Sequence, residues 1–284
     1  MTSIEKKSIL CPQCRKLISS DERVCPYCGT TSPGSLWKQG ILGGFSLFRV
    51  DPVKTIITVN VAFYLFSLLF SLLLKPSSLG LSANPMTFLS PADGSLFFLG
   101  ATGTLPIASY GRWWTLISAS FLHGGLLHLF FNMMALRQLA PFVLDEFGFH
   151  RFAILYLWTG VAGFYLSYLA GVPFTIGASA SVCGLIGAIL YYGKSRGGFY
   201  GEQIYRQAMG WVVGLVLFGL FFPGINNWAH GGGLVSGVLI AFLLGYRDRT
   251  AKQSLHSFLA TASILLTAAT LLWALIRAVY IVLT

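Results

Sequence analysis

Long apolar segments constrain this chain more than any other feature of its sequence. Hydrophobic residues fill 55% of the 284 positions and charged residues only 10%, whereas a soluble domain carries about 25% charged residues. A helix needs about 20 apolar residues to cross a bilayer. We expect seven such spans, at roughly 54–74, 114–138, 152–171, 178–193, 208–222, 228–245 and 256–281. The sequence therefore predicts an all-α polytopic membrane protein.

The basic residues alternate between the two ends of these spans. The formal net charge is +10, and lysines and arginines gather before the first expected span and after the second, fourth and sixth. The remaining loops hold little beyond Lys75 and Arg112, and the stem of Arg277 can reach the headgroups from the last span. The positive-inside rule then places the N-terminus in the cytoplasm and the C-terminus outside. Topology accounts for the basic excess, and we expect no nucleic-acid partner.

Two cysteine pairs stand close together near the N-terminus. Cys11-Pro12-Gln13-Cys14 and Cys25-Pro26-Tyr27-Cys28 offer four thiolates, which suit tetrahedral zinc. The alternatives are two disulfides or redox-active thiols, and a cytoplasmic location disfavours disulfides. We expect a structural zinc ribbon that is too short to fold without its metal. Such a module can bind a protein, bind nucleic acid, sense metal or order the tail, and we expect a structural role or a contact with a protein partner.

A few polar residues interrupt the apolar spans. His123, His128 and Asn132 lie in the second span, Ser179 begins the fourth and His230 begins the sixth. These three spans all run inward if the N-terminus is cytoplasmic, so the polar residues lie at a similar depth in the outer half of the bilayer. Polar groups there are costly and usually functional. A simpler explanation exists for each alone, because a serine can cap a helix and a histidine can bridge helices.

Small residues surround the serine and the last histidine. The stretches Gly177-Ala178-Ser179-Ala180-Ser181 and Ala229-His230-Gly231-Gly232-Gly233 allow two helices to approach backbone to backbone. A hydroxyl near an imidazole is the minimal form of an activated serine nucleophile. The amides that open the helix of Ser179 point to where an oxyanion would form. Ser181 is a rival nucleophile, but it lies about 200° further round the helix.

These motifs make residues 54–245 resemble a rhomboid intramembrane serine protease. The resemblance implies a six-helix core with one additional C-terminal helix, and a hydrophobic loop 75–113 before the second span. It also implies that Ser179 is the nucleophile and His230 its base, without a carboxylate or a catalytic cofactor. His128 and Asn132 would donate to the oxyanion, and His123 would belong to a supporting polar network. The substrates would be transmembrane proteins cleaved at small residues near the outer end of a span.

The sequence departs from this family at three positions. Ala180 replaces a glycine beside the nucleophile, Thr115 replaces the arginine of a loop Trp-Arg pair, and Cys183 replaces a bulkier side chain. The alternative function is therefore a catalytically inactive relative that binds transmembrane helices. A transporter is disfavoured because the chain lacks repeat symmetry and a pair of broken helices. A buried thiol such as Cys183 is expected to be inert.

We thus expect four regions: a zinc ribbon at 1–35, a linker and interfacial segment at 36–53, a protease core at 54–245 and a further transmembrane helix at 246–284. About fifty polar residues precede the first span, so no cleavable signal peptide is expected. With no transit peptide recognised, we expect a bacterial inner (plasma) membrane.

Overall fold

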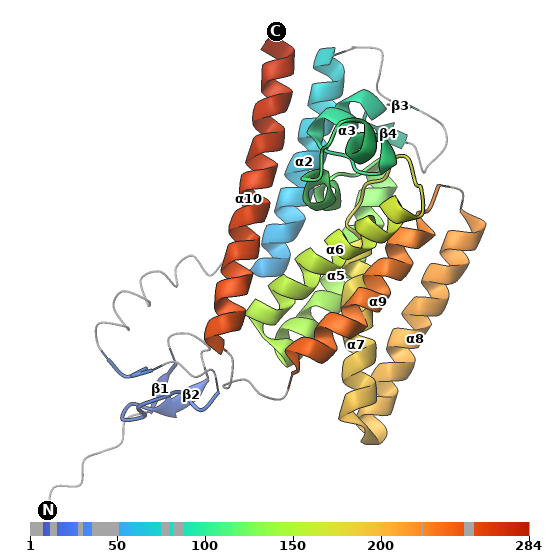
Figure 1. Ribbon diagram of the computed structural model, residues 1–284. Coiled ribbons are helices and arrows are strands. Elements are labelled where there is room, and N and C mark those ends of the chain that lie inside the picture. The colour runs from blue at the N-terminus through green and yellow to red at the C-terminus, as the bar shows by residue number, and fades with distance from the viewer. Residues whose placement is uncertain are drawn as a thin grey trace, which may run out of the picture. The chain divides into compact units, whose positions relative to one another are not determined.

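The computed structural model describes residues 8–11, 16–27, 31–35, 51–74, 80–81, 88–222, 224–246 and 253–283. The chain divides into two compact units. The first comprises Met1–Asp51 with Arg247–Leu255, and the second comprises Pro52–Tyr246 with His256–Thr284. The first unit contains the cysteine pairs, and the second contains the polar residues predicted to form a site (Figure 1).

The first unit begins with two short antiparallel strands, β1 (Ser8–Leu10) and β2 (Leu17–Ser19). Ile9 lies opposite Ile18, and Cys11 follows β1 directly. The backbone amide of Cys11 donates to the carbonyl of Lys16 at 3.0 Å and closes the hairpin. Residues 1–7, 12–15, 28–30 and 36–50 lie outside the described residues, and they include Cys14, Cys28 and most of the predicted linker.

Seven long helices lie wholly or largely in the second unit. They are α2 (Pro52–Leu74), α5 (Leu126–Phe147), α6 (Phe149–Leu169), α7 (Ser179–Arg196), α8 (Gly198–Phe221), α9 (Asn227–Leu244) and α10 (Gln253–Leu283). All except α7 are long and apolar enough to span a membrane, which gives six candidate spans in the described part of the chain. The chain is thus an integral multi-pass membrane protein. α7 is less apolar because protein rather than lipid covers most of its serines and glycines.

The second predicted span is wrong at its N-terminal end. The structure has a short α4 (Thr115–Ser118) and a 3-10 turn η4 (Ala119–Phe121), after which the chain extends and α5 begins only at Leu126. Two consecutive glycines, Gly124 and Gly125, make a continuous helix unfavourable at this point. His123 therefore lies in the connection before α5 and not inside a membrane helix.

Smaller elements fill the connection between α2 and α4. They are β3 (Gly80–Leu81), β4 (Phe88–Ser90), α3 (Asp93–Leu99) and the π-helical turn η3 (Leu105–Ser109). Leu96 and Leu99 of α3 share a buried cluster with Phe63 and Phe70 of α2. The described part of this predicted loop is therefore packed against the helices rather than separate from them.

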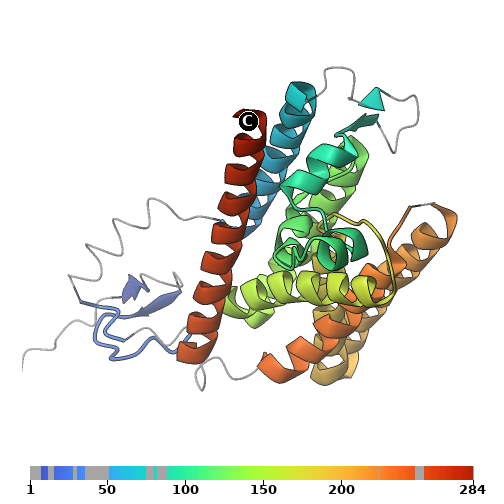
Figure 2. The same ribbon diagram turned by 45° about the horizontal axis from the view of Figure 1, so that its top comes forward.

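The centre of the second unit is a glycine-lined contact of α6, α7 and α9 (Figure 1, Figure 2). A Cβ on Gly233 or Gly237 of α9 would overlap the carbonyl of Ala180 or of Gly184 on α7. A Cβ on Gly163 of α6 would lie 2.5 Å from the carbonyl oxygen of Ala229. The prediction that small residues let these helices meet backbone to backbone is confirmed.

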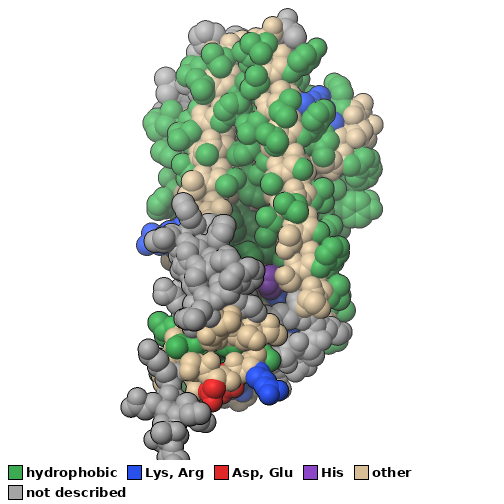
Figure 3. Space-filling view, turned by 90° about the vertical axis from the view of Figure 1, so that its left-hand side faces the viewer, with side chains coloured by type: hydrophobic (Ala, Val, Ile, Leu, Met, Phe, Trp, Pro, Cys, Tyr) green, Lys and Arg blue, Asp and Glu red, His purple; other side chains and the backbone are tan. Residues whose placement is uncertain are grey.

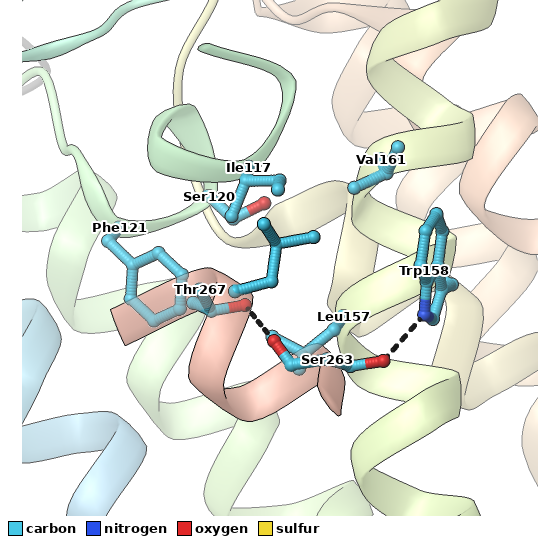
Figure 4. A pocket seen from close by; sticks show the side chains of 9 residues that line it. Ile117, Ser120, Phe121, Leu157, Trp158, Val161, Ser263 and Thr267 are labelled. Atoms are coloured by element: carbon cyan, nitrogen blue, oxygen red, sulfur yellow. Dashed lines mark hydrogen bonds between the residues drawn. The ribbon is translucent and has the colours of Figure 1, made fainter. Parts of the chain in front are cut away.

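The last helix, α10, packs beside α2 and α6 (Figure 1, Figure 2). The indole Nε1–H of Trp158 on α6 donates to Ser263 Oγ on α10 at 2.9 Å, and Ser263 and Thr267 are buried. Both line a cavity of about 20 Å³ between α6, α10 and η4 (Figure 4), roughly the room for one water. The other face of α10 is apolar and exposed (Figure 3).

Candidate active site

Ser179 is the first residue of α7, and two contacts hold the segment before it. Thr175 pairs with Thr102 through backbone hydrogen bonds of 3.0 and 2.7 Å, and the Gly177 amide donates to the carbonyl of Ala119 at 2.9 Å. Gly177 has a φ of 121°, a conformation that favours glycine. The N-cap position belongs to Ala178, which makes no side-chain cap. The Ser179 hydroxyl is therefore not the helix cap that a serine at a helix start often provides.

The Ser179 hydroxyl instead meets His230. Ser179 Oγ and His230 Nε2 are 2.8 Å apart, and each side chain is only partly buried. The close approach depends on Gly233, one turn after His230, whose missing side chain lets α9 lie on the backbone of Ala180. His230 Nδ1 is buried and has no hydrogen-bond partner among the described residues. The pair can act as a nucleophile and its base.

His128 lies beside the same serine, and its hydrogen bonding sets its tautomer. The Gly124 amide donates to His128 Nδ1 at 3.3 Å, so in a neutral ring the proton sits on Nε2. A Cβ built on Gly177 would lie 2.7 Å from His128 Nε2 and 3.8 Å from Ser179 Oγ. The Nε2–H donor therefore lies close to the serine hydroxyl, across a position that only glycine leaves open. This is a suitable place for a donor to an oxyanion.

Asn132 lies one turn further along α5. Its Nδ2 donates to the carbonyl of His128 at 2.8 Å, and its side chain is buried. That bond uses one of the two N–H groups of the amide and leaves the second as a donor. The structure thus brings Ser179, His230 and His128 together. Asn132 lies next to His128, one turn further along α5.

His123, which is predicted to belong to a supporting polar network, lies in the connection before α5. Its side chain is completely buried, and neither ring nitrogen has a hydrogen-bond partner among the described residues. Its contact is with the His128 ring, edge to face, at 5.1 Å between centroids. The His123 ring therefore supports His128 by packing against it.

The rival Ser181 and the variant Ala180 both face α6. A Cβ on Gly160 of α6 would overlap the hydroxyls of Ser181 and Ser120, so Ser181 faces α6 rather than α9. The Ala180 methyl points toward Gly163 of α6. A side chain on Gly163 would come within 2.9 Å of that methyl, so the glycine makes room for it. Cys183 is buried.

Sequence reasoning missed Asn226, which caps α9. Its Oδ1 accepts from the Ala229 amide at 3.0 Å. Its Nδ2 donates to Ser167 Oγ on α6 at 2.6 Å and to Thr175 Oγ1 at 2.9 Å. One side chain thus fastens the start of the His230 helix to α6 and to the segment that leads into Ser179. An asparagine just before a glycine-rich apolar run was the available signal.

The cysteines fit a metal site as far as they are described. Cys11 and Cys25 are buried in one small cluster with Ile18. A backbone bridge between Val24 and Thr31 closes the turn that carries the second pair. Two cysteines from separate turns therefore share one small core, which suits a common ligand. Within the described residues no group of three metal ligands occurs, and the other cysteine of each pair lies outside them.

Comparison with known proteins supports the rhomboid family. The family profile described as Rhomboid domain matches residues 110–247, which include every residue of the candidate active site. RHOMBOID-like protein 4 of Arabidopsis thaliana is 35% identical over 168 residues, which cover 57% of this chain and 41% of that protein. The helical membrane unit is consistent with a rhomboid-like polytopic membrane protein.

Two further relatives differ in activity. Rhomboid protease GluP of Bacillus subtilis is 32% identical over 139 residues, covering 49% of this chain and 27% of its own length. Inactive RHOMBOID-like protein 8 of Arabidopsis thaliana is 31% identical over 159 residues, covering 55% and 44%. In these three relatives the match spans less than half of their length. The relatives thus include both a protease and a protein named as inactive.

Proposed function

We propose that this chain is an intramembrane serine endopeptidase that cleaves transmembrane segments of other membrane proteins. The observation that carries the proposal is the 2.8 Å contact between Ser179 Oγ and His230 Nε2 in a helical unit that contains six candidate spans. The Rhomboid domain match and the GluP relative agree with it. We further propose cleavage at small residues near the outer end of the substrate helix.

The chemistry follows from the positions of these groups. Ser179 Oγ attacks the scissile carbonyl while its proton passes to His230 Nε2. The oxyanion accepts from His128 Nε2–H, from the second N–H of Asn132 and from the Ser179 amide, which has no acceptor within its own helix. His230 then protonates the leaving amine, and water hydrolyses the acyl-enzyme by the reverse route. No cofactor enters these steps.

A cleavage assay in liposomes tests the proposal with the full chain and a single-span substrate. Ser179→Ala and His230→Ala should each abolish the cleavage product without changing thermal unfolding, because they remove the nucleophile and its base. Ser181→Ala is the matched control and should keep activity, since its hydroxyl faces α6. Full cleavage activity in the Ser179→Ala variant would show that Ser179 is not the nucleophile.

The second candidate function is binding of transmembrane helices without cleavage. It is supported by the relative named as inactive and by Ala180 beside the nucleophile. The intact Ser179–His230 contact argues against it, because a binding protein has no need of the pair. A native chain that cross-links to the substrate in the same liposomes and never cleaves it would establish this alternative.

We propose a structural zinc ion held by Cys11, Cys14, Cys25 and Cys28. Its support is the spacing of the two pairs and the common core of Cys11 and Cys25. The ion would order this small module and take no part in cleavage. A protein partner is the role that we favour for the module.

We also propose that the N-terminus is cytoplasmic, because basic residues gather on that side of the spans. The Bacillus subtilis relative agrees with a bacterial plasma membrane, whereas the plant relatives point to eukaryotic membranes. Cysteine labelling with a membrane-impermeant reagent on either side of the membrane measures the orientation.

A further inference from the structure

Two arginines lie at the end of the second unit where α10 ends. Arg112 lies in the turn before α4, and Arg277 lies on the last turns of α10. The Arg277 guanidinium carbon is 5.9 Å from the ring centroid of Trp114, two residues after Arg112. The Arg112 guanidinium lies over the Phe97 ring at 4.2 Å and near the Tyr110 ring at 5.2 Å. The two cations therefore belong to one cluster with three aromatic rings.

The two positive charges of this cluster lie near one another. The pKa of Arg112 lies below its usual value because burial disfavours its charge and because the charge of Arg277 is nearby. Neither arginine forms an ion pair with a carboxylate in the described part of the chain. Arg112 Nη1 donates to the carbonyl of Phe97 at 3.3 Å, which uses one of five guanidinium N–H groups. An anion between the two arginines would offset their repulsion and use their remaining donors.

The surroundings of the cluster indicate which anion it takes. Tyr110, Trp113, Trp273 and Tyr280 are exposed around it, and such aromatic residues gather at the membrane–water interface. Basic atoms lie near the upper edge of an otherwise apolar face of the molecule in Figure 3. Acyl chains can lie along that face while a headgroup phosphate meets the arginines. A free phosphate would gain nothing from the apolar surface.

We propose that Arg112 and Arg277 together bind the phosphate of a phospholipid headgroup. Arginine suits this ligand because its planar guanidinium presents paired N–H groups to phosphate oxygens. The bound lipid would join the turn before α4 to the end of α10, which are far apart in sequence. The proposal requires only the membrane unit and is independent of proteolysis.

Native mass spectrometry of the full chain in detergent tests the proposal with added phosphatidylglycerol. The native chain should retain one phospholipid more tightly than diacylglycerol, which lacks the phosphate. Arg112→Gln and Arg277→Gln should each weaken retention about fivefold or more, the effect of one basic residue at a lipid surface. Because the phosphate is shared, the double variant should lose much less than the product of the two single losses.

Arg137→Gln is the matched control, because it removes one exposed arginine from another helix, and it should retain the lipid as the native chain does. Arg277→Lys keeps the charge without the paired donors, so it should rank between the native chain and Arg277→Gln. The Arg277→Lys variant also tests the proposal if the double variant does not fold. Equal retention by native, Arg277→Lys and Arg277→Gln chains overturns the proposal.

Two other outcomes identify a different ligand. Displacement by millimolar inorganic phosphate, with no preference for the lipid, would show a phosphate site that does not recognise membranes and would overturn the proposal. The proposal would also be overturned if the arginine variants retained the lipid as the native chain does but cleaved more slowly only those substrates that carry acidic residues beside the span. That result would assign the arginines to a substrate carboxylate.

Discussion

α9 and α8 both pack on α7, and α9 does so backbone to backbone over a longer stretch, at Gly233 and at Gly237. Gly233 and Gly237 leave room for carbonyl groups of α7, so no side chain separates the two helices. α8 buries only Gly201 and Ala208 among its described side chains and touches α7 near Gly193. Its other apolar side chains are largely exposed. α8 approaches the backbone of α7 at Gly201 and Gly193, whereas the rest of α8 is loosely covered.

The comparison indicates where precision matters for the proposed chemistry. A hydroxyl and an imidazole must stay about 3 Å apart for proton transfer, and a shift of one ångström at the α7–α9 contact would separate them. The α7–α8 contact carries no such pair. We therefore expect the same substitution to have unequal effects at the α7–α9 contact and in the part of α8 that lies away from α7.

The largest difference should follow from adding one methyl group to α9 at the α7–α9 contact and one to α8 at a position away from α7. Gly233→Ala would push α9 away from the backbone of Ala180, at a cost of about 1–3 kcal/mol of stability and of nearly all cleavage. Gly210→Ala and Gly214→Ala on α8 have nothing within 4 Å of the new methyl and should be neutral. Thermal unfolding and liposome cleavage measure both effects.

Gly231→Ala is the control within α9, because its methyl would also meet nothing within 4 Å. It should fold and cleave as the native chain does. Similar losses in Gly231→Ala and Gly233→Ala would contradict the role of the α7–α9 contact.

A smaller loss should come from the two side chains proposed as oxyanion donors. His128→Ala and Asn132→Ala should each lower kcat by about 10²–10³, the usual effect of one oxyanion donor, with little change in KM. Steady-state kinetics on a fluorogenic transmembrane substrate separate the two parameters. A raised KM with unchanged kcat would instead assign these side chains to substrate binding.

Asn226 variants test how far cleavage depends on holding the start of α9 in place. Asn226→Ala removes the cap and both bonds to the neighbouring segments, and loss of a cap typically costs about 1 kcal/mol. Cleavage should fall about tenfold, the rate effect of 1.4 kcal/mol. Asn226→Asp keeps a cap acceptor and can accept from the Ser167 and Thr175 hydroxyls, so it should restore part of the activity. Equal activity of the Ala and Asp variants would argue against this positioning role.

The smallest effect on cleavage should come from the N-terminal unit. Deleting residues 1–35 should remove one zinc ion per chain and leave cleavage in detergent unchanged, because no residue of this segment belongs to the candidate active site. Atomic absorption and the cleavage assay measure the two results. A metal-free intact chain would contradict the ribbon, and lost cleavage with a folded membrane unit would reveal regulation by it.

The apolar runs predicted most of the helices, because hydrophobicity over about 20 residues is a local property. The glycine stretches predicted that the helices of Ser179 and His230 would meet, because a missing side chain acts in the same way in any packing. The error at 114–138 has an equally local cause. Apolarity alone cannot distinguish a continuous span from buried short helices, and Gly124-Gly125 was the only sign of the break.

The sequence by itself determined which chemistry-bearing residues sit at helix starts, namely Ser179 and His230, since each precedes a long apolar run. Only the tertiary structure decided how they are held. The Asn226 bonds join residues 51 and 59 positions apart, and Gly163 makes room for Ala180 from a separate helix. The proton on His128 is set by a backbone amide in a turn that periodicity does not predict. Such contacts depend on how separate helices pack, and periodicity along one helix carries no record of its neighbours.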